Sequence, residues 1–267
     1  MKYFKKLLLT CLTASFVLSS LTGCSKTPTG MLVDYAEKKR TEEGADTADA
    51  TQNDTLLWIN GTYAILTELN GWDYMIYSGK EYNPSMEEYY QDTLEDWWGV
   101  EDRETADSTL EWALYEGHRA EFAAIMEQLK EEGIEEVDHD DRSEYLYEYY
   151  DMTSDEAEYF ANMYDYYEEY GPTAIDAWDY SRAVYLPSMY YLAGYYTEEE
   201  AKQKSLEISK QIQQQFTSWD DFMESYFRGY EYWAEESSDE RRDIYEEIKA
   251  DPNGPYSLDW NMTLEDL

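Results

Sequence analysis

A carboxylate and a guanidinium share one face of a predicted helix and are the side chains of this sequence best placed to do chemistry together. Asp179 and Arg182 stand three residues apart, and Trp178 directly precedes the acid. Four residues fall on one helical stripe at offsets of four, seven and eleven: Ile175, Asp179, Arg182 and Leu186. Because two of them are aliphatic, the stripe indicates a partly buried ion pair. Desolvation makes such a pair costly, so proteins keep it for structural specificity or for a site.

His118, one of two histidines in the chain, could join this pair. It follows the apolar stripe of a long acidic helix predicted over 103–131, together with Leu114, Phe122, Ile125 and Leu129. A histidine on such a face is more often a hydrogen-bonded packing residue, so we favour a structural role. The alternative is a cleft in which His118 transfers a proton, Arg182 holds an anionic substrate and Trp178 lines a ligand pocket.

Motifs of the common catalytic and cofactor-binding classes are absent from the sequence. It contains no Gly-x-Ser-x-Gly elbow, no His-Glu-x-x-His pair and no glycine-rich phosphate loop. The acidic run Asp138-His139-Asp140-Asp141 lacks the glycine and the bidentate glutamate of a calcium loop, and we interpret it as a solvated turn. We therefore assign no catalytic residue, no metal site and no cofactor, and we lean against an enzyme.

The N-terminus has the layout of a bacterial lipoprotein signal. Lys2, Lys5 and Lys6 precede an apolar run that ends in Leu21-Thr22-Gly23-Cys24, which resembles the lipobox recognised by lipoprotein-processing enzymes. We predict a signal peptide over 1–23, lipidation of Cys24 by acyl chains such as palmitate, and a flexible tether over 24–54. The expected location is the extracytoplasmic side of the cell membrane or cell envelope. The alternative is an ordinary secretory signal with a chance cysteine.

Charge is the second constraint on partners. The chain carries 60 acidic and 20 basic residues, and cleavage of the signal removes three lysines and leaves a net charge of −43. Such a surface repels nucleic acid and anionic headgroups, so the lipid is the expected membrane contact. Disordered acidic chains are poor in aromatic residues, whereas this chain has 29 Tyr and 9 Trp. The composition predicts a folded acidic domain that binds a cationic peptide or protein, or weakly a divalent cation.

Residues 55–267 predict one irregular all-α domain of about eight helices. The hydrophobic pattern is helical and contains no alternating strand-like runs. Helix starts are marked by Ser or Thr with Glu three residues later, and by one looser acidic variant: Ser85, Thr153, Thr197, Ser237 and the variant Ser218. Pro187 is expected to kink or end its helix. The predicted helices are 55–69, 85–98, 103–131, 154–169, 173–193, 197–216, 218–235 and 238–250.

Four blocks of residues cover most of positions 85–235 and carry a family resemblance. They are Asp96-Trp97-Trp98-Gly99-Val100 with Arg103-Glu104; Leu110-Glu111-Trp112 with Glu116-Gly117-His118-Arg119-Ala120-Glu121-Phe122; Ala177-Trp178-Asp179-Tyr180-Ser181-Arg182 with Gly194-Tyr195 and Glu199-Glu200-Ala201; and Ser218-Trp219-Asp220-Asp221-Phe222 with Tyr226, Gly229 and Trp233. Together they resemble the bacterial proteins grouped as domain of unknown function 1266. The resemblance implies a helical fold and supplies no mechanism, and this chain departs from the family in its lipid signal and its acidity. We group Trp219 with His118, Trp178, Asp179 and Arg182 as a candidate ligand-binding or structural cluster.

A membrane-anchored lipoprotein with an acidic, aromatic-rich domain is expected to act in binding or interaction at the cell envelope. Aromatic side chains would supply contact area, and carboxylates would select cationic or metal-bearing partners. Two alternatives remain open. One is an enzyme of unknown reaction built on a cleft of His118, Asp179 and Arg182, and the other is a purely structural envelope component.

Overall fold

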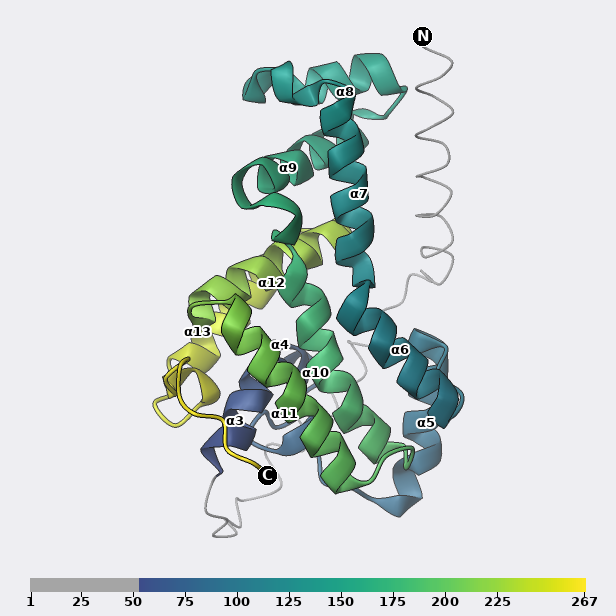
Figure 1. Cartoon of the computed structure of the whole chain (residues 1–267), viewed down its shortest axis with the longest axis vertical. Helices are drawn as coiled ribbons and strands as arrows, with labels where there is room; N and C mark the ends of the chain where they lie inside the picture. The colour runs from purple at the N-terminus through teal and green to yellow at the C-terminus, as the bar shows by residue number, and fades with distance from the viewer. Residues whose placement is uncertain (1–52) are drawn as a thin grey trace.

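Helices account for all regular structure in residues 53–267, the part of the chain that the computed structural model describes (Figure 1). The all-α prediction is therefore confirmed for this range. The predicted signal peptide, Cys24 and almost all of the predicted tether lie outside the described residues. Within those residues, no helix is long and apolar enough to cross a membrane.

Most α-helices follow one another through short connections; the α4–α5 and α7–α8 connections are longer and contain two 3₁₀ turns each. The α-helices are α3 (Asp54–Gly61), α4 (Ala64–Leu69), α5 (Glu87–Trp98), α6 (Arg103–Tyr115), α7 (Gly117–Glu131), α8 (Arg142–Tyr150), α9 (Ser154–Tyr170), α10 (Asp176–Leu192), α11 (Glu198–Gln215), α12 (Trp219–Ala234) and α13 (Asp239–Lys249). The 3₁₀ turns are η1 (Tyr77–Gly79), η2 (Pro84–Met86), η3 (Ile134–Glu136), η4 (His139–Asp141), η5 (Gly171–Thr173) and η6 (Pro255–Ser257).

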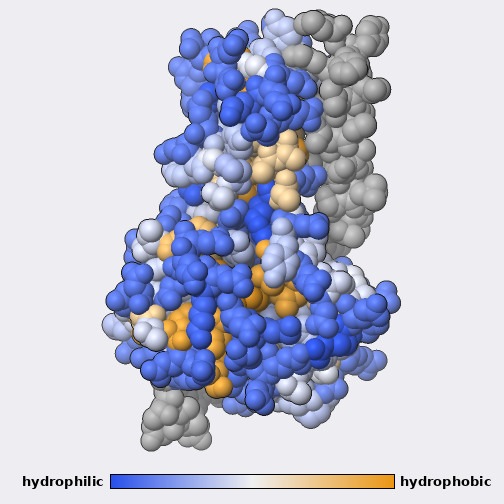
Figure 2. Space-filling view, viewed as in Figure 1, coloured by the Kyte–Doolittle hydropathy of each residue, from blue (hydrophilic) through white to orange (hydrophobic). Residues whose placement is uncertain are grey.

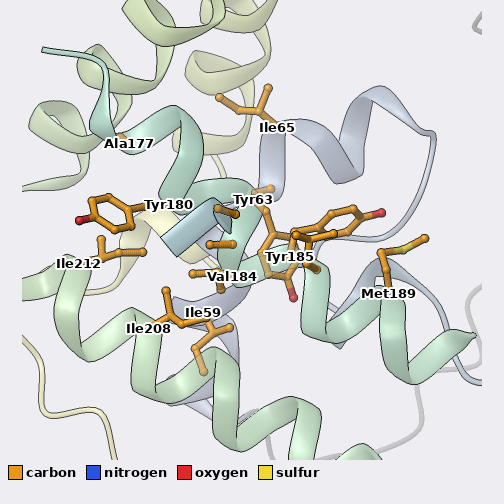
Figure 3. Close-up of a cluster of buried hydrophobic side chains, with 14 of the residues drawn as sticks. Ile59, Tyr63, Ile65, Ala177, Tyr180, Val184, Tyr185, Met189, Ile208 and Ile212 are labelled. Atoms are coloured by element: carbon orange, nitrogen blue, oxygen red, sulfur yellow. The ribbon is translucent and has the colours of Figure 1, made fainter. Parts of the chain in front are cut away.

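Helix α10 forms the centre of the larger core. Every residue of this helix except Tyr191 is buried, which fits a sequence in which aromatic, aliphatic and small side chains cover all its faces. It packs most extensively against α11 and α12, and also against α6. Figure 3 shows Val184 and Tyr185 of α10 beside Ile208 of α11 and Ile59 of α3. The first described helix and the middle of the chain thus share one core.

A second, smaller core holds together α7, α8 and α9, which form the upper part of the molecule in Figure 1 and which we call the α7–α9 lobe (residues 117–170). Phe122 of α7, Leu146 of α8 and Tyr164 of α9 are all buried in it. Three buried residues from outside the lobe complete it, namely Ala174 and Ile175 before α10 and Tyr232 of α12. The two cores therefore meet near the beginning of α10.

Helix boundaries differ from the predictions in three places. The predicted helix 55–69 divides into α3 and α4, and the predicted helix 103–131 divides into α6 and α7 at Glu116 and Gly117. Gly117 has a φ of +61°, a conformation that glycine adopts at little cost. Helix α8 was not among the predicted helices. Pro187 does not end α10, which runs on to Leu192.

Predicted helix caps are confirmed at three positions and wrong at two. Thr153, Thr197 and Ser218 each accept a hydrogen bond from a backbone N–H of the first turn, as expected for a cap. Ser85 is not a cap, because Asn83 accepts the first backbone N–H of η2 and α5 begins only at Glu87. Ser237 is not the N-cap residue, because Ser238 takes that position and makes no side-chain capping bond. Oγ of Ser237 nevertheless accepts the N–H of Asp239, the first residue of α13, at 3.2 Å.

Candidate functional site

Asp179 and Arg182 form a buried ion pair on α10. Asp179 is 0% exposed and Arg182 is 8% exposed, and Nη2 of the arginine donates to Oδ1 of the acid. Their stripe neighbours Ile175 and Leu186 are also fully buried. The two predicted partners do form an ion pair, and the pair is more deeply buried than the sequence analysis predicted. Since a lone buried charge would be very costly, each residue requires the other.

The same carboxylate caps helix α7 from outside that helix. Oδ2 of Asp179 accepts the backbone N–H of Arg119 at 2.8 Å, in the first turn of α7, and lies 3.4 Å from Nη1 of the Arg119 side chain. A negative charge at a helix N-terminus is favoured by the free N–H groups and by the helix dipole. No side chain can stand at Gly117, because a Cβ there would lie 2.3 Å from Oδ2. Asp179 therefore joins the larger core to the α7–α9 lobe.

Two neighbouring acids on the first turn of α10 have opposite pKa shifts. Burial alone would raise the pKa of Asp179, but the Arg182 charge, His118 and the Arg119 N–H together outweigh burial and lower it to about 2. Burial raises the pKa of Asp176 to about 7, against the opposing effect of Arg119, and the Asp179 charge adds to the rise. Burial lowers the pKa of Arg182, and Asp179 opposes that change. Asp179 is thus ionised at neutral pH, whereas Asp176 is close to its midpoint.

His118 lies against the ion pair, as the cleft hypothesis requires. Its Nδ1 is 2.8 Å from Nη2 of Arg182 and 3.3 Å from Oδ1 of Asp179. A guanidinium can only donate, so Nδ1 accepts from Arg182 when the imidazole proton is on Nε2, whereas an Nδ1–H donates to Oδ1 of Asp179. The ring also packs edge-on against Trp112 at 5.2 Å. His118 is therefore held as a packing and hydrogen-bonding residue with a partly exposed edge, its side chain being 21% exposed.

Catalysis by this trio would require an open cleft that reaches Asp179. The three side chains do converge, but Asp179 has no exposed surface and both its oxygens already accept hydrogen bonds. Within residues 53–267, no group of three His, Cys, Asp or Glu side chains is placed to hold a metal ion. The geometry consequently favours the structural interpretation of His118, Asp179 and Arg182 over the catalytic one.

Trp178 belongs to the neighbourhood of the ion pair, whereas Trp219 does not contact it. The Trp178 ring lies 4.5 Å from Cζ of Arg182 and packs against Trp233 of α12 at 5.4 Å. Trp219, at the other end of α12, packs against Trp58 and Trp260 and donates its indole N–H to the Leu258 carbonyl. Among the described residues, Trp219 shares no ring contact or hydrogen bond with His118, Trp178, Asp179 or Arg182.

Three residues of this neighbourhood were not singled out from the sequence. Arg119 supplies the capped N–H and stacks its guanidinium on Tyr180 at 4.7 Å, and Trp98 lies 5.6 Å from Cζ of Arg182. The third is Gly117, which gives Asp179 room to approach. A glycine followed by His118 and Arg119 inside an apparently continuous helix was the available signal for a break.

Removing one partner of the ion pair should destabilise the protein far more than removing an exposed arginine. We expect Arg182→Ala to lower the free energy of unfolding by about 3 to 5 kcal/mol, because it leaves the Asp179 charge buried and unpaired. The control is Arg103→Ala, whose partners Asp107 and Glu200 are partly exposed, with an expected loss below about 1 kcal/mol. Urea denaturation followed by circular dichroism measures both. Equal losses in the two variants would contradict a structural ion pair.

Asp176 should produce a pH dependence that an amide removes. Because its pKa is raised from 3.8 to about 7 in the folded protein, its contribution to stability is fully present below pH 4 and is lost as the pH rises through 7. We expect Asp176→Asn to raise the unfolding free energy at pH 8 by about 1 to 4 kcal/mol relative to the parent. The variant should gain less, or lose stability, at pH 4. Denaturation of both proteins at the two pH values measures the difference, and a variant that is less stable at pH 8 would contradict this account.

Comparison with known proteins places these residues in a family. Searches of curated proteins and of solved structures each found no significant match. The sequence profile of the family described as Protein of unknown function (DUF1266) matches residues 93–260, which is more than half of the chain and includes Trp98, His118, Asp179 and Arg182. The chain therefore belongs to the DUF1266 family.

Proposed function

We propose that this protein is a lipid-anchored component of the bacterial cell envelope that binds a cationic polypeptide through the α7–α9 lobe. The proposal joins two features. One is the signal and lipobox that end at Cys24, which would attach the chain to a membrane on its extracytoplasmic side. The other is the distribution of charge over the lobe, which carries the argument for a cationic partner.

Acidic residues dominate the outer part of the lobe. Residues 127–170 contain 17 Asp or Glu, two Lys or Arg and nine Tyr. One of the two bases, Arg142, is only 3% exposed, because it faces inward and pairs with Asp165 and with Glu168 at 2.7 Å. The outer part of the lobe therefore carries many more carboxylates than basic groups, and Figure 2 shows hydrophilic residues over most of the upper lobe.

Helix α8 exposes acidic residues and a tyrosine together on one outer face. Leu146 and Tyr150 are buried toward α9, whereas Glu144, Tyr147 and Glu148 are exposed. Neither glutamate forms an ion pair within residues 53–267. Tyrosine rings beside carboxylates suit Lys and Arg side chains, since the carboxylate attracts the charge and the ring contacts the alkyl stem or the cation. An open hollow on α7, lined by Glu127, Glu131 and Glu132 among others, extends the acidic surface.

An enzymatic role remains the second candidate because His118, Asp179 and Arg182 do converge. It would have to work through the exposed edge of His118, since Asp179 is inaccessible. A purely structural role would need neither an accessible imidazole nor an exposed acidic face. The binding proposal is preferred because it uses the surface that the fold exposes.

Neutralising the outer face of α8 should weaken binding to a basic probe. We expect Glu144→Gln/Glu148→Gln to reduce the affinity of the full-length protein for a lysine-rich peptide by about threefold to tenfold at low salt, and less at high salt, because screening weakens the contacts. Isothermal titration calorimetry at two salt concentrations measures this. The matched control is Glu199→Gln/Glu207→Gln, which makes the same charge change on α11, a helix whose lysines offset its acids. Equal losses of affinity in both variants would mean that the peptide is attracted by the net charge of the whole protein, which would contradict a site on the lobe.

Lipid attachment should depend on the sulfur atom of Cys24. We expect Cys24→Ser to abolish incorporation of labelled palmitate and to move the protein from the membrane fraction to the soluble fraction of its host, because the thiol is the acyl acceptor. Labelling and fractionation of cells expressing each form provide the measurement. Labelled protein that persists in the serine variant would contradict lipidation at Cys24.

A further inference from the structure

Two arginines approach the same tryptophan beside the ion pair, and one of them has no carboxylate partner. Cζ of Arg182 lies 4.5 Å from the Trp178 ring, and Cζ of Arg241, on α13, lies 5.8 Å from the same ring. Arg241 also stacks on Tyr230 at 3.9 Å. Within residues 53–267, no Asp or Glu oxygen forms an ion pair with Arg241. In a chain of net charge −40, an arginine without a carboxylate is unexpected.

Hydrogen-bond donors outnumber acceptors around these rings. Nη1 of Arg241 donates to the Tyr226 hydroxyl at 3.0 Å, so the tyrosine oxygen accepts and its own hydrogen has no acceptor among the described residues. The indole N–H of Trp178 is buried and has no hydrogen-bond partner, although Trp178 is only 5% exposed. Nη1 of Arg182 also makes no hydrogen bond within the described range, because the bonds of this guanidinium are made by Nε and Nη2, but Nη1 is not a fully buried atom. A buried donor without a partner, such as the Trp178 indole N–H, is rare and costly, so it requires an explanation.

The neighbouring arginine provides a contrast within the same helix. Arg242 donates from both terminal nitrogens to the Glu224 carboxylate, at 2.6 and 3.0 Å, and from Nε to Ser238. Each nitrogen of its guanidinium thus donates to a side chain of the protein. Glu236 accepts a hydrogen bond at 3.4 Å from Tyr230, the ring on which Arg241 stacks, but it does not form an ion pair with Arg241. Adjacent arginines therefore differ in whether the fold supplies them with an anion.

We propose that Arg182, Arg241, Trp178 and Tyr226 form a binding site for the carboxylate group of a ligand that carries an aromatic or apolar body. A planar carboxylate matches the edge of a guanidinium and accepts from several donors at once. Trp233, which is exposed, and Tyr230, which is partly exposed, offer ring faces for the rest of the ligand. A singly charged carboxylate is repelled less by the acidic protein than a phosphate dianion, since repulsion grows with ligand charge. The residues differ from those of the α7–α9 lobe, so this site does not rest on the proposed function.

The direct test compares acids with their neutral amides on the full-length protein in detergent. The first pair of probes is 3-phenylpropionate and 3-phenylpropanamide, and the second is N-acetyl-glycyl-phenylalanine with a free or an amidated C-terminus. Quenching of tryptophan fluorescence measures binding. We expect an acid to bind at least about tenfold more tightly than its amide, because the charge-assisted hydrogen bonds are lost in the amide. Preference for the small acid indicates a free carboxylic acid as ligand, and preference for the peptide acid indicates a C-terminus, and both support the site.

Variants then locate the binding. Arg241→Gln should lose about tenfold or more in affinity for the acid and little for the amide, whereas Arg242→Gln should remain within about twofold of the parent. Thermal unfolding of each variant shows whether it is folded, and the acid-to-amide ratio of the parent tests the proposal without any variant. Acids that bind no better than amides would overturn the proposal. So would equal losses in Arg241→Gln and Arg242→Gln.

Discussion

The structure depends on how one buried negative charge is neutralised. Asp179 has no contact with solvent, and it stays ionised because Arg182 lies beside one oxygen and the first turn of α7 donates to the other. Each element would be costly alone, since a carboxylate, a guanidinium and a free helix N-terminus all lose hydration on burial. Together they satisfy one another. The pair is therefore a joint between two helices as well as an interaction within α10.

The contacts of Asp179 connect the two hydrophobic cores of the molecule. The larger core surrounds α10, and the smaller core lies inside the α7–α9 lobe, whose helix α7 has its first turn against Asp179. Gly117 permits the close approach, and Ile175 and Tyr232 carry apolar contact across the boundary. A rigid attachment of the lobe would present the acidic face of α8 in a fixed orientation. The proposed carboxylate site is formed by Arg182 and Trp178 of α10, Tyr226 of α12 and Arg241 of α13, so Arg182 would contribute to both regions.

Local patterns predicted the elements well and their long-range partners poorly. The pairing of Asp179 with Arg182 follows from three-residue spacing between aliphatic neighbours, and both residues lie on one helix. The break at Gly117 was missed because the apolar stripe through His118 continues across it, and the cause is a carboxylate more than sixty residues away. The predicted grouping of Trp219 with the ion pair failed for the same reason, because the observed partner of Trp219 is Trp260, which lies far along the chain. No local spacing reports such a contact.

Hydrogen exchange of the full-length protein carrying Asp179→Asn tests this joint most directly. An asparagine keeps the shape, but either orientation of its amide sets an N–H group against the Arg182 guanidinium or the Arg119 N–H, which are themselves donors. The account predicts that backbone protection falls across residues 117–170 while the segments of α10 and α11 keep most of theirs. A uniform loss of protection in both cores, or unchanged protection in the lobe, would show that Asp179 does not join them.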